Sequence, residues 1–422
     1  MKMNNENPIK LPEGWKGEKI GDNDFKILCS GIERFEGEKD YLSTESIQGT
    51  KIEKIESKIS YKKRPSRANM QPVLNSVWFA KMKGTTKVYC FDETNKSELN
   101  KYILSTGFAG INPLNCKAKF LKYFFLSPNF NLEKDNLSTG TTQVAINNDG
   151  IKKIEIIYPE SIEEQTQIVQ EIEKQFTRLD AAVKSLKEVK NKLEVYRKSV
   201  LKAAFEGKLV EKKGDWNYEK LSDLCVINPP KKEVRNLDEN IEITFIPMHS
   251  VSEKGKIISR EKKKLRDVIN GYTYFKEGDV LLAKITPCFE NGKRAIAKDL
   301  KNGVGFGSTE FHILRPKEKV TSDWIFFSIS RDDFKNEAKN KMTGTAGQKR
   351  VPARIVENFK ISVPKVQEQT QIASEIESKF SVIDKLEETV DNTLLKAEQL
   401  RKSILKYAFE GRLVKFNRGG EK

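Results

Sequence analysis

The sequence has 422 residues, which is too long for one ordinary hydrophobic core and predicts two or three domains. Lys and Arg exceed Asp and Glu by 16, and the sequence pI is near 9.3, so we expect a broadly basic surface and a polyanionic partner. Nucleic acid is favoured over a membrane, because no basic amphipathic helix dominates and no apolar run reaches about 18 residues. A lysine-rich proteome is the alternative source of the charge.

The amino-terminal stretch MKMNNENPIKLPEGW has no apolar signal core, which predicts a cytoplasmic protein. The two isolated histidines, His249 and His312, are expected to be structural rather than catalytic. An odd number of scattered cysteines predicts neither a disulfide framework nor a zinc site. These cysteines are Cys29, Cys90, Cys116, Cys225 and Cys288.

Residues 1–160 contain short β-branched and aromatic runs broken by Gly, Asn and Pro, which predicts a mixed domain rich in strands. Residues 161–207 have apolar side chains at alternating steps of three and four, which is typical of a long amphipathic helix that needs a partner helix. Pro159 followed by Ser161 and Glu164 predicts a capping box at its start, and Gly207 its end. The expected seam is Ile168, Ile172, Phe176, Leu179, Val183, Leu186, Leu193, Tyr196 and Val200.

Residues 208–365 repeat the pattern of the first domain, and residues 366–411 repeat the helix, before a tail at 412–422. The segment RKSVLKAAFEGKLV recurs as RKSILKYAFEGRLV with an offset of 204, and EQTQI recurs with the same offset. Two shorter segments repeat with weaker similarity: VWFAKMKGT resembles VLLAKITPC, and TGTTQ resembles TGTAGQ. The second seam is expected at Ile372, Ile376, Phe380, Ile383, Val390, Leu394, Ala397, Leu400 and Ile404, and its helix is expected to end at Gly411.

The order domain, helix, domain, helix predicts an internal pseudo-twofold repeat. Antiparallel pairing of the helices as a coiled coil would put the two domains at opposite ends of a rod of roughly 65 Å. A reader of duplex DNA with this symmetry would present two related domains to two half-sites at a fixed spacing. The expected fold class is therefore α+β, with two mixed α/β domains separated by two long antiparallel helices.

The chain resembles the specificity subunits of type I restriction-modification systems. The resemblance covers essentially the whole chain and rests on YPESIEEQTQIVQEIEKQF, VPKVQEQTQIASEIESKF, EGDVLLAKI, a Gly-Thr-Gln turn before each helix, and the two AFEG segments. One departure is that many relatives have two adjacent prolines before the Glu-Gln pair. The resemblance implies two target recognition domains, which bind the half-sites of a bipartite double-stranded DNA target, and two helices that act as a ruler.

The resemblance also implies partners that perform the chemistry. Two modification subunits would methylate adenine with S-adenosylmethionine, and ATP-dependent restriction subunits would translocate and cut DNA. The chain itself is then expected to be non-catalytic, with no catalytic residue, metal or cofactor of its own.

Basic loops supply the candidate DNA-binding residues, because Lys and Arg suit phosphate contact while Arg and Gln also fit guanine and adenine edges. The alternative is that each cluster is merely a solvated face. In the first domain the candidates are Lys62, Lys63, Arg64, Arg67, Lys81, Lys83 and Gln143. In the second they are Lys231, Lys232, Arg235, Lys262, Lys263, Lys264, Lys284, Arg294, Gln348, Lys349 and Arg350. Among them, the candidates for base readout are Arg67, Gln143, Arg294, Gln348 and Arg350.

The helix ends carry more apolar surface than a two-helix seam requires, which predicts either a partner surface or packing against the protein's own domains. The candidate partner-binding residues are Val200, Leu201, Ala204, Phe205, Ile404, Leu405, Ala408 and Phe409. The residues alone do not decide between the two interpretations.

Several enzyme signals are weak. NPPK at 228–231 has a lysine where an amino-methyltransferase loop has an aromatic residue, so a Pro-rich turn is the better interpretation. Asp40, Glu56 and Lys58 have the residue types of a nuclease site, but such spacings are common in a chain that is 32% charged. A self-contained nuclease or methyltransferase, and a basic coiled-coil scaffold, are the alternative functions.

Overall fold

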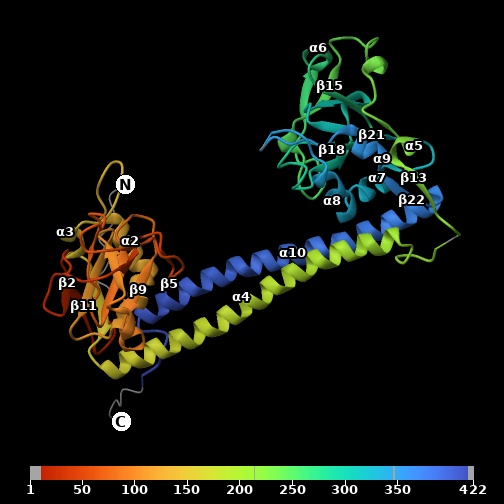
Figure 1. Cartoon of the computed structure of the whole chain (residues 1–422). Helices are drawn as coiled ribbons and strands as arrows, with labels where there is room; N and C mark the ends of the chain where they lie inside the picture. The colour runs from red at the N-terminus through yellow and green to blue at the C-terminus, as the bar shows by residue number, and fades with distance from the viewer. Residues whose placement is uncertain (1–10, 213, 346, 417–422) are drawn as a thin grey trace. The chain divides into compact units, whose positions relative to one another are not determined.

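The structure is a computed structural model that describes residues 11–212, 214–345 and 347–416 (Figure 1). The chain forms two compact units, of which the first comprises residues up to 186 together with residues from 391 onward. The second comprises residues 187–390. Most of the amino-terminal stretch without a signal core, and residues 417–422 of the expected tail, lie outside the described residues.

The first unit contains a strand-rich domain. Its strands are β1 (Trp15–Lys19), β2 (Phe25–Leu28), β3 (Lys39–Leu42), β4 (Ile47–Gln48), β5 (Lys51–Ile52), β6 (Ser57–Ile59), β7 (Ala68–Met70), β8 (Ser76–Ala80), β9 (Val88–Phe91), β10 (Tyr102–Ser105), β11 (Phe108–Pro113) and β12 (Glu155–Pro159). Its helices are η1 (Glu93–Glu98), α1 (Ala118–Leu126), α2 (Pro128–Asn136) and α3 (Asn148–Ile151). They precede the long helix α4 (Ile162–Phe205).

The second unit contains a domain of the same kind. Its strands are β13 (Asn217–Lys220), β14 (Cys225–Ile227), β15 (Glu242–Ile246), β16 (Glu261–Lys264), β17 (Thr273–Lys276), β18 (Val280–Ala283), β19 (Arg294–Ile296), β20 (Val304–Gly307), β21 (Phe311–Pro316) and β22 (Lys360–Val363). Its helices are α5 (Leu221–Leu224), η2 (Lys231–Val234), η3 (Met248–Ser250), α6 (Leu265–Val268), η4 (Lys301–Gly303), α7 (Ser322–Ser328), α8 (Asp332–Asn340) and α9 (Ala353–Asn358). The second long helix, α10 (Val366–Phe409), follows.

The two domains share one topology. One sheet has the order β2-β11-β8-β9 in the first domain and β14-β21-β18-β19 in the second. Another has the order β6-β3-β10-β7 or β16-β15-β20-β17, and in both cases only the central pair is parallel. A short antiparallel pair, β1-β12 or β13-β22, leads into each long helix. The internal repeat predicted from the sequence is therefore confirmed in the fold.

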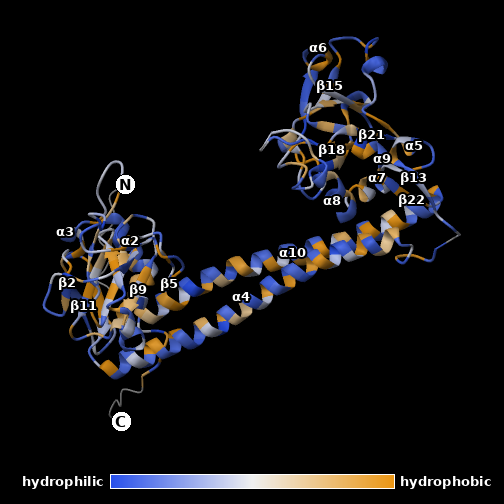
Figure 2. Cartoon of the chain, viewed as in Figure 1, coloured by the Kyte–Doolittle hydropathy of each residue, from blue (hydrophilic) through white to orange (hydrophobic). Residues whose placement is uncertain are grey.

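Each domain core is built on its central strands. All five residues of β8 are buried, and so are all four of β18. In the first domain Phe79 of β8 packs edge-on against Phe125 of α1 and Phe130 of α2, with ring centroids 4.8 and 5.1 Å apart. Such pairs add about 0.5–1.5 kcal/mol to the benefit of burial. Figure 2 shows hydrophobic segments inside both domains, among hydrophilic loops.

The two long helices form an antiparallel coiled coil, which is seen in each unit separately. In the first unit the guanidinium of Arg401 lies 4.2 Å from the ring centroid of Phe176 and pairs with Asp180. In the second unit Arg197 lies 4.5 Å from the ring centroid of Phe380 and pairs with Asp384 at 2.6 Å. These contacts are related by the repeat offset of 204, so the same arginine–phenylalanine–aspartate contact joins the helices in both units.

The seam follows the predicted stripe except at two equivalent positions. Ile168, Ile172, Ile383 and Val390 are buried as expected, whereas Tyr196 is 49% exposed and Leu400 is 51% exposed. The seam assignment of Tyr196 and Leu400 was therefore wrong. The next residue of each helix, Arg197 or Arg401, turns inward instead, because its aliphatic stem and its stacked guanidinium cover the partner phenylalanine.

The start of α4 and the ends of both helices follow the residues as predicted. The Ser161 hydroxyl accepts a hydrogen bond from the Glu164 backbone N–H at 3.3 Å. Beyond the carboxyl ends, Gly207 and Gly411 both have φ of +69°, in the left-handed region that closes a helix. Among the described residues, no helix is both long enough and apolar enough to cross a membrane.

Candidate nucleic-acid interface

Lys81, Lys83 and Gln143 are brought together at one edge of the first domain. The loop of residues 139–145 is closed by paired backbone hydrogen bonds between Thr139 and Ala145, at 3.0 and 3.1 Å. It joins the continuation of β8, because the Lys83 N–H donates to the Val144 carbonyl at 3.0 Å. Gln143 and Lys83 are exposed, and burial lowers the pKa of the half-buried Lys81. Gln143 is thus brought to the same site as Lys81 and Lys83, about sixty residues earlier in the sequence.

Lys284, Gln348, Lys349 and Arg350 meet in the same way in the second domain. The Thr286 N–H donates to the Lys349 carbonyl at 2.9 Å. Gln348 and Lys349 are exposed, while Arg350 is only partly exposed.

Arg350 already has a strong partner in Glu310. Its Nε and Nη2 donate to the carboxylate at 3.0 and 2.7 Å, and this bond raises the pKa of Arg350 above its ordinary value. A guanidinium held in this bidentate way has fewer donors left for a base edge. Gln348 and Lys349 are therefore more accessible than Arg350 in this loop.

The loop at 61–67 presents its charges on an aromatic support. Arg64 stacks 4.5 Å from the ring centroid of Tyr61 and donates to the Tyr61 carbonyl at 2.6 Å. Lys62, Lys63 and Arg67 remain exposed. Because Arg64 is held, these three side chains are the more accessible cations of this loop.

The second domain has its own basic edge at β16. Lys263 lies 3.7 Å from the ring centroid of Phe245, so its ammonium group is held on one face of the sheet. Lys262 and Lys264 are exposed and alternate with it along the strand, on the opposite face.

The segment at 229–235 is anchored by hydrogen bonds of Lys231 and Glu233 to neighbouring elements. Lys231 donates to the Ile269 carbonyl at 2.7 Å, and burial lowers its pKa. Glu233 accepts from Arg315 at 2.9 Å and from the Tyr274 hydroxyl at 2.9 Å. Lys232 and Arg235 are exposed and are the members of this segment that could contact phosphate.

The prediction that Arg294 reads a base is wrong for this structure. Arg294 is only 9% exposed, donates to the Gly292 carbonyl at 2.7 Å and to the Ser330 hydroxyl, and lies over the ring of Phe326. Burial lowers its pKa to about 10. Arg294 begins β19, which pairs with β18 in the core sheet, and its guanidinium is bound within the domain.

The helix-end residues pack on the protein's own domains. In the first unit Phe409 packs against Phe120 and Phe124, with centroids 5.2 and 5.3 Å apart. In the second unit Phe205 packs against Trp324 at 4.3 Å. All eight candidates are at most 7% exposed: Val200, Leu201, Ala204, Phe205, Ile404, Leu405, Ala408 and Phe409. The assignment of these side chains to a partner surface is corrected accordingly, since a partner could not reach them without opening a core.

The weak enzyme signals have structural explanations. Asn228 adopts a left-handed backbone with φ of +52°, and its side chain accepts from the Ile313 N–H at 3.0 Å and contacts His312 Nδ1 at 3.2 Å. NPPK is thus a turn held to β21. His312 is buried, which lowers its pKa, and its Nε2 lies 2.8 Å from the Val351 carbonyl oxygen. Within the described ranges no cluster of His, Cys, Asp and Glu could hold a metal ion.

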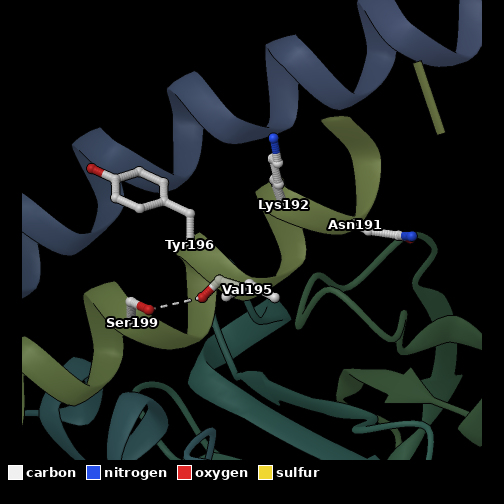
Figure 3. A pocket seen from close by; sticks show the side chains of 5 residues that line it. All are labelled: Asn191, Lys192, Val195, Tyr196 and Ser199. Carbon is white, nitrogen blue, oxygen red and sulfur yellow. Dashed lines mark hydrogen bonds between the residues drawn. The ribbon is translucent and has the colours of Figure 1, made fainter. Parts of the chain in front are cut away.

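A shallow pocket of about 340 Å³ lies on α4 (Figure 3). It is lined by Asn191, Lys192, Val195, Tyr196 and Ser199, and the Ser199 hydroxyl donates to the Val195 carbonyl of its own helix at 3.0 Å. The Ser199 hydroxyl is therefore engaged by its own helix.

Sequence reasoning missed two buried glutamines, one in each long helix, that hold the start of the helix to its domain. Gln165 accepts from the Lys117 N–H at 2.8 Å and donates to the Pro159 carbonyl at 2.8 Å. Gln369 accepts from the Thr321 N–H at 2.9 Å and donates to the carbonyls of Lys319 and Pro364. Both are fully buried, and the repeated EQTQI segment was the signal that could have revealed them.

The two halves of the chain each match a known protein family. A family model described as the type I restriction modification DNA specificity domain matches residues 19–195 and again residues 213–396. The chain is 39% identical over 202 residues to the specificity subunit of the type I restriction enzyme EcoAI of Escherichia coli, covering 47% of the chain and 34% of that protein. It is 36% identical over 211 residues to the EcoEI specificity subunit of Escherichia coli, covering 50% and 35%. These matches span about a third of each relative's length.

A longer match joins the chain to the MjaVIII specificity subunit of Methanocaldococcus jannaschii, at 24% identity over 432 residues, covering 96% of the chain and 94% of that protein. Among solved structures, the HsdS subunit from Thermoanaerobacter tengcongensis has a TM-score of 0.59 at 20% identity, covering 96% and 99%. A chain from a type I R-M system, solved for its complex assembly and conformational transition, has a TM-score of 0.76 at 19% identity, covering 96% and 100%. At such identities the likeness concerns the fold. Because the family model matches more than half of the sequence, in two copies, the chain belongs to the type I restriction modification DNA specificity domain family.

Proposed function

We propose that this protein is the DNA sequence-specificity subunit of a type I restriction-modification complex. It binds a bipartite double-stranded target through its two domains, one half-site to each. The observation that carries the proposal is the duplicated domain, in which exposed lysine and glutamine side chains converge at equivalent loops. The net charge of +16 supports a polyanionic partner.

The proposal assigns the chemistry to partner subunits. Two modification subunits supply adenine methylation, ATP-dependent restriction subunits supply cleavage, and this chain determines which DNA sequence the complex binds. The proposed interface contains basic and amide side chains, which bind phosphates and base edges but do not form a nucleophile–base pair. Such a complex would meet its DNA in the cytoplasm.

The test is to reconstitute the chain with the modification subunit of its own system and to map methylated adenines on genomic DNA. We expect one split sequence with a constant gap. Methyl transfer by the chain alone, or methylation with no sequence pattern, would contradict the proposal.

A ruler role for the helices has its own test. One helical turn inserted into both α4 and α10 adds about 5.4 Å to each. The gap between the half-sites should then grow by one or two base pairs, because duplex rise is about 3.4 Å. An unchanged gap in a complex that still methylates DNA would exclude the ruler.

A further inference from the structure

The two domains have diverged in most loops but retain one loop in common. We call residues 139–145 and 343–350 the shared loops; residue 346 lies outside the described residues. Both begin Thr-Gly-Thr and contain a glutamine near their ends. Thr343 and Arg350 exchange backbone hydrogen bonds at 2.9 and 2.8 Å, as Thr139 and Ala145 do in the first loop. The closure is thus preserved although the second loop is one residue longer.

The shared loops also dock on the same strand in the same way. The Ile146 N–H donates to the Lys81 carbonyl at 3.0 Å, and the Val351 N–H donates to the Lys284 carbonyl at 2.8 Å. In each domain the lysine that follows the buried central strand therefore lies beside the shared loop. The match extends to the backbone and does not depend on similar side chains alone.

Glycine fixes the shape of both shared loops. Gly140 has φ of +120° and Gly344 has φ of +125°, where other residues are strained. A Cβ atom would lie 2.5 Å from the Gln143 carbonyl oxygen at Gly140, and 2.8 Å from the Gln348 carbonyl oxygen at Gly344. The turn therefore requires glycine, and the turn places the exposed glutamine.

The charges beside the shared loops are also alike. Lys81 and Lys83 accompany the first loop, while Lys284, Lys349 and Arg350 accompany the second. Glu310 neutralises one cation of the second set through Arg350. Each site is thus left with two positive charges and one exposed glutamine amide, which are ligands for a phosphate diester.

The other basic loops differ between the domains. The loop at 61–67 rests on Tyr61 in the first domain, whereas the basic strand β16 rests Lys263 on Phe245 in the second. A contact that is identical in both domains cannot distinguish two different half-sites, but it suits the phosphate backbone, which is the same at every site. Contacts found in one domain alone are the ones that can discriminate.

We propose that the shared loops are phosphate clamps that grip the DNA backbone at both half-sites, and that the loop at 61–67 and strand β16 carry the base discrimination. This inference rests on the proposed function and divides its interface into two kinds of contact. In particular, it moves Gln143 and Gln348 from base readout to backbone contact.

The test uses the full chain in complex with its modification subunit. Lys83→Ala and Lys349→Ala each remove one exposed cation from a shared loop, and Lys402→Ala removes an exposed cation of α10 as the matched control. Binding is measured by fluorescence anisotropy on the mapped target, on the target with one half-site scrambled, and on an unrelated duplex, at several salt concentrations. Methylated adenines are mapped for every variant.

For each shared-loop variant we expect binding to weaken about fivefold on all three duplexes. The slope of log affinity against log salt should fall by about 0.9, and the methylated sequence should stay the same. Lys62→Ala with Lys63→Ala should instead change the preference at one half-site. An altered base preference for Lys83→Ala or Lys349→Ala, or unchanged affinity on every duplex, would overturn the inference while leaving the proposed function standing. A wild-type complex without sequence preference would overturn both.

Discussion

Replacing Gln369 with alanine should loosen the amino-terminal end of α10 from the second domain. The Gln369 amide is fully buried and makes three hydrogen bonds: its oxygen accepts from the Thr321 N–H, and its nitrogen donates to two carbonyls. Alanine removes these hydrogen bonds and leaves the Thr321 N–H and the two carbonyls without this partner. The change is local, because α10 keeps its own backbone hydrogen bonds.

The expected cost follows from the partners that lose their bonds. A buried donor or acceptor left unsatisfied costs about 1–3 kcal/mol. The Pro364 carbonyl belongs to a buried residue, whereas Lys319 is exposed and its carbonyl can be hydrated. We therefore expect Gln369→Ala to lower the free energy of unfolding of the second unit by about 2–4 kcal/mol.

Hydrogen exchange combined with urea unfolding would measure this effect. Amides of residues 319–324 and 365–372 should exchange faster in Gln369→Ala, while those around Gln165 in the first unit should keep their wild-type rates. The matched control is Gln371→Ala, an exposed glutamine of the same helix, which should change the unfolding free energy by less than about 0.5 kcal/mol. Equal destabilisation by the two substitutions would refute the role of Gln369, because losing a buried, hydrogen-bonded amide would then cost no more than losing an exposed one.

Gln369→Glu sharpens the same test. The carboxylate is nearly isosteric and can still accept from the Thr321 N–H, but it cannot donate to the carbonyls of Lys319 and Pro364. We expect it to destabilise the second unit at neutral pH at least as much as alanine does. Full stability of this variant would show that packing, and not the donated hydrogen bonds, holds the helix end.

Three further outcomes are expected. Arg294→Met should destabilise the second unit by about 2–4 kcal/mol in urea unfolding, because it leaves buried acceptors unpaired, and should leave the methylated sequence unchanged. Burial raises the pKa of Asp24, but hydrogen bonds from Lys16 and two other residues outweigh it and hold that pKa well below its ordinary value of 3.8. The resulting stabilisation of the first unit is present above about pH 4 and is lost as pH falls below it; urea unfolding from pH 7 to pH 3 should show this loss in the wild type and less of it in Asp24→Asn. A double-mutant cycle of Arg197→Ala and Asp384→Ala should give a coupling of about 0.5–1.5 kcal/mol, since the pair is only partly exposed and Arg197 also stacks on an aromatic ring.

The long helices were predictable because their pattern is local and occurs twice. A 3.6-residue period, a capping serine and a terminal glycine act within a few residues, so Ile162–Phe205 and Val366–Phe409 follow the sequence closely. Tyr196 and Leu400 were misplaced because periodicity assigns the seam to an apolar side chain. It does not foresee that an adjacent arginine covers the seam by stacking.

The candidate site was predictable only as a set of residue types. The convergence of Lys83 with Gln143 depends on backbone bonds across about sixty residues, which no local pattern reveals. Arg294 was misassigned because its charge was weighed without its neighbours, although the apolar residues that follow it indicated a core strand. The hydrogen bonds of Gln369 join the start of α10 to a segment about fifty residues earlier, so only the repeat itself pointed to them.

The two units differ in how their cores are assembled along the chain. The second unit is one continuous stretch, residues 187–390, whereas the core of the first unit incorporates Ile404, Leu405, Ala408 and Phe409. A ribosome makes those four residues only after the whole of the second unit. The nascent first domain must therefore hold an open apolar patch beside Phe120 and Phe124 while the second domain is synthesised and completed. Chaperone dependence or aggregation during expression should accordingly begin at the first domain.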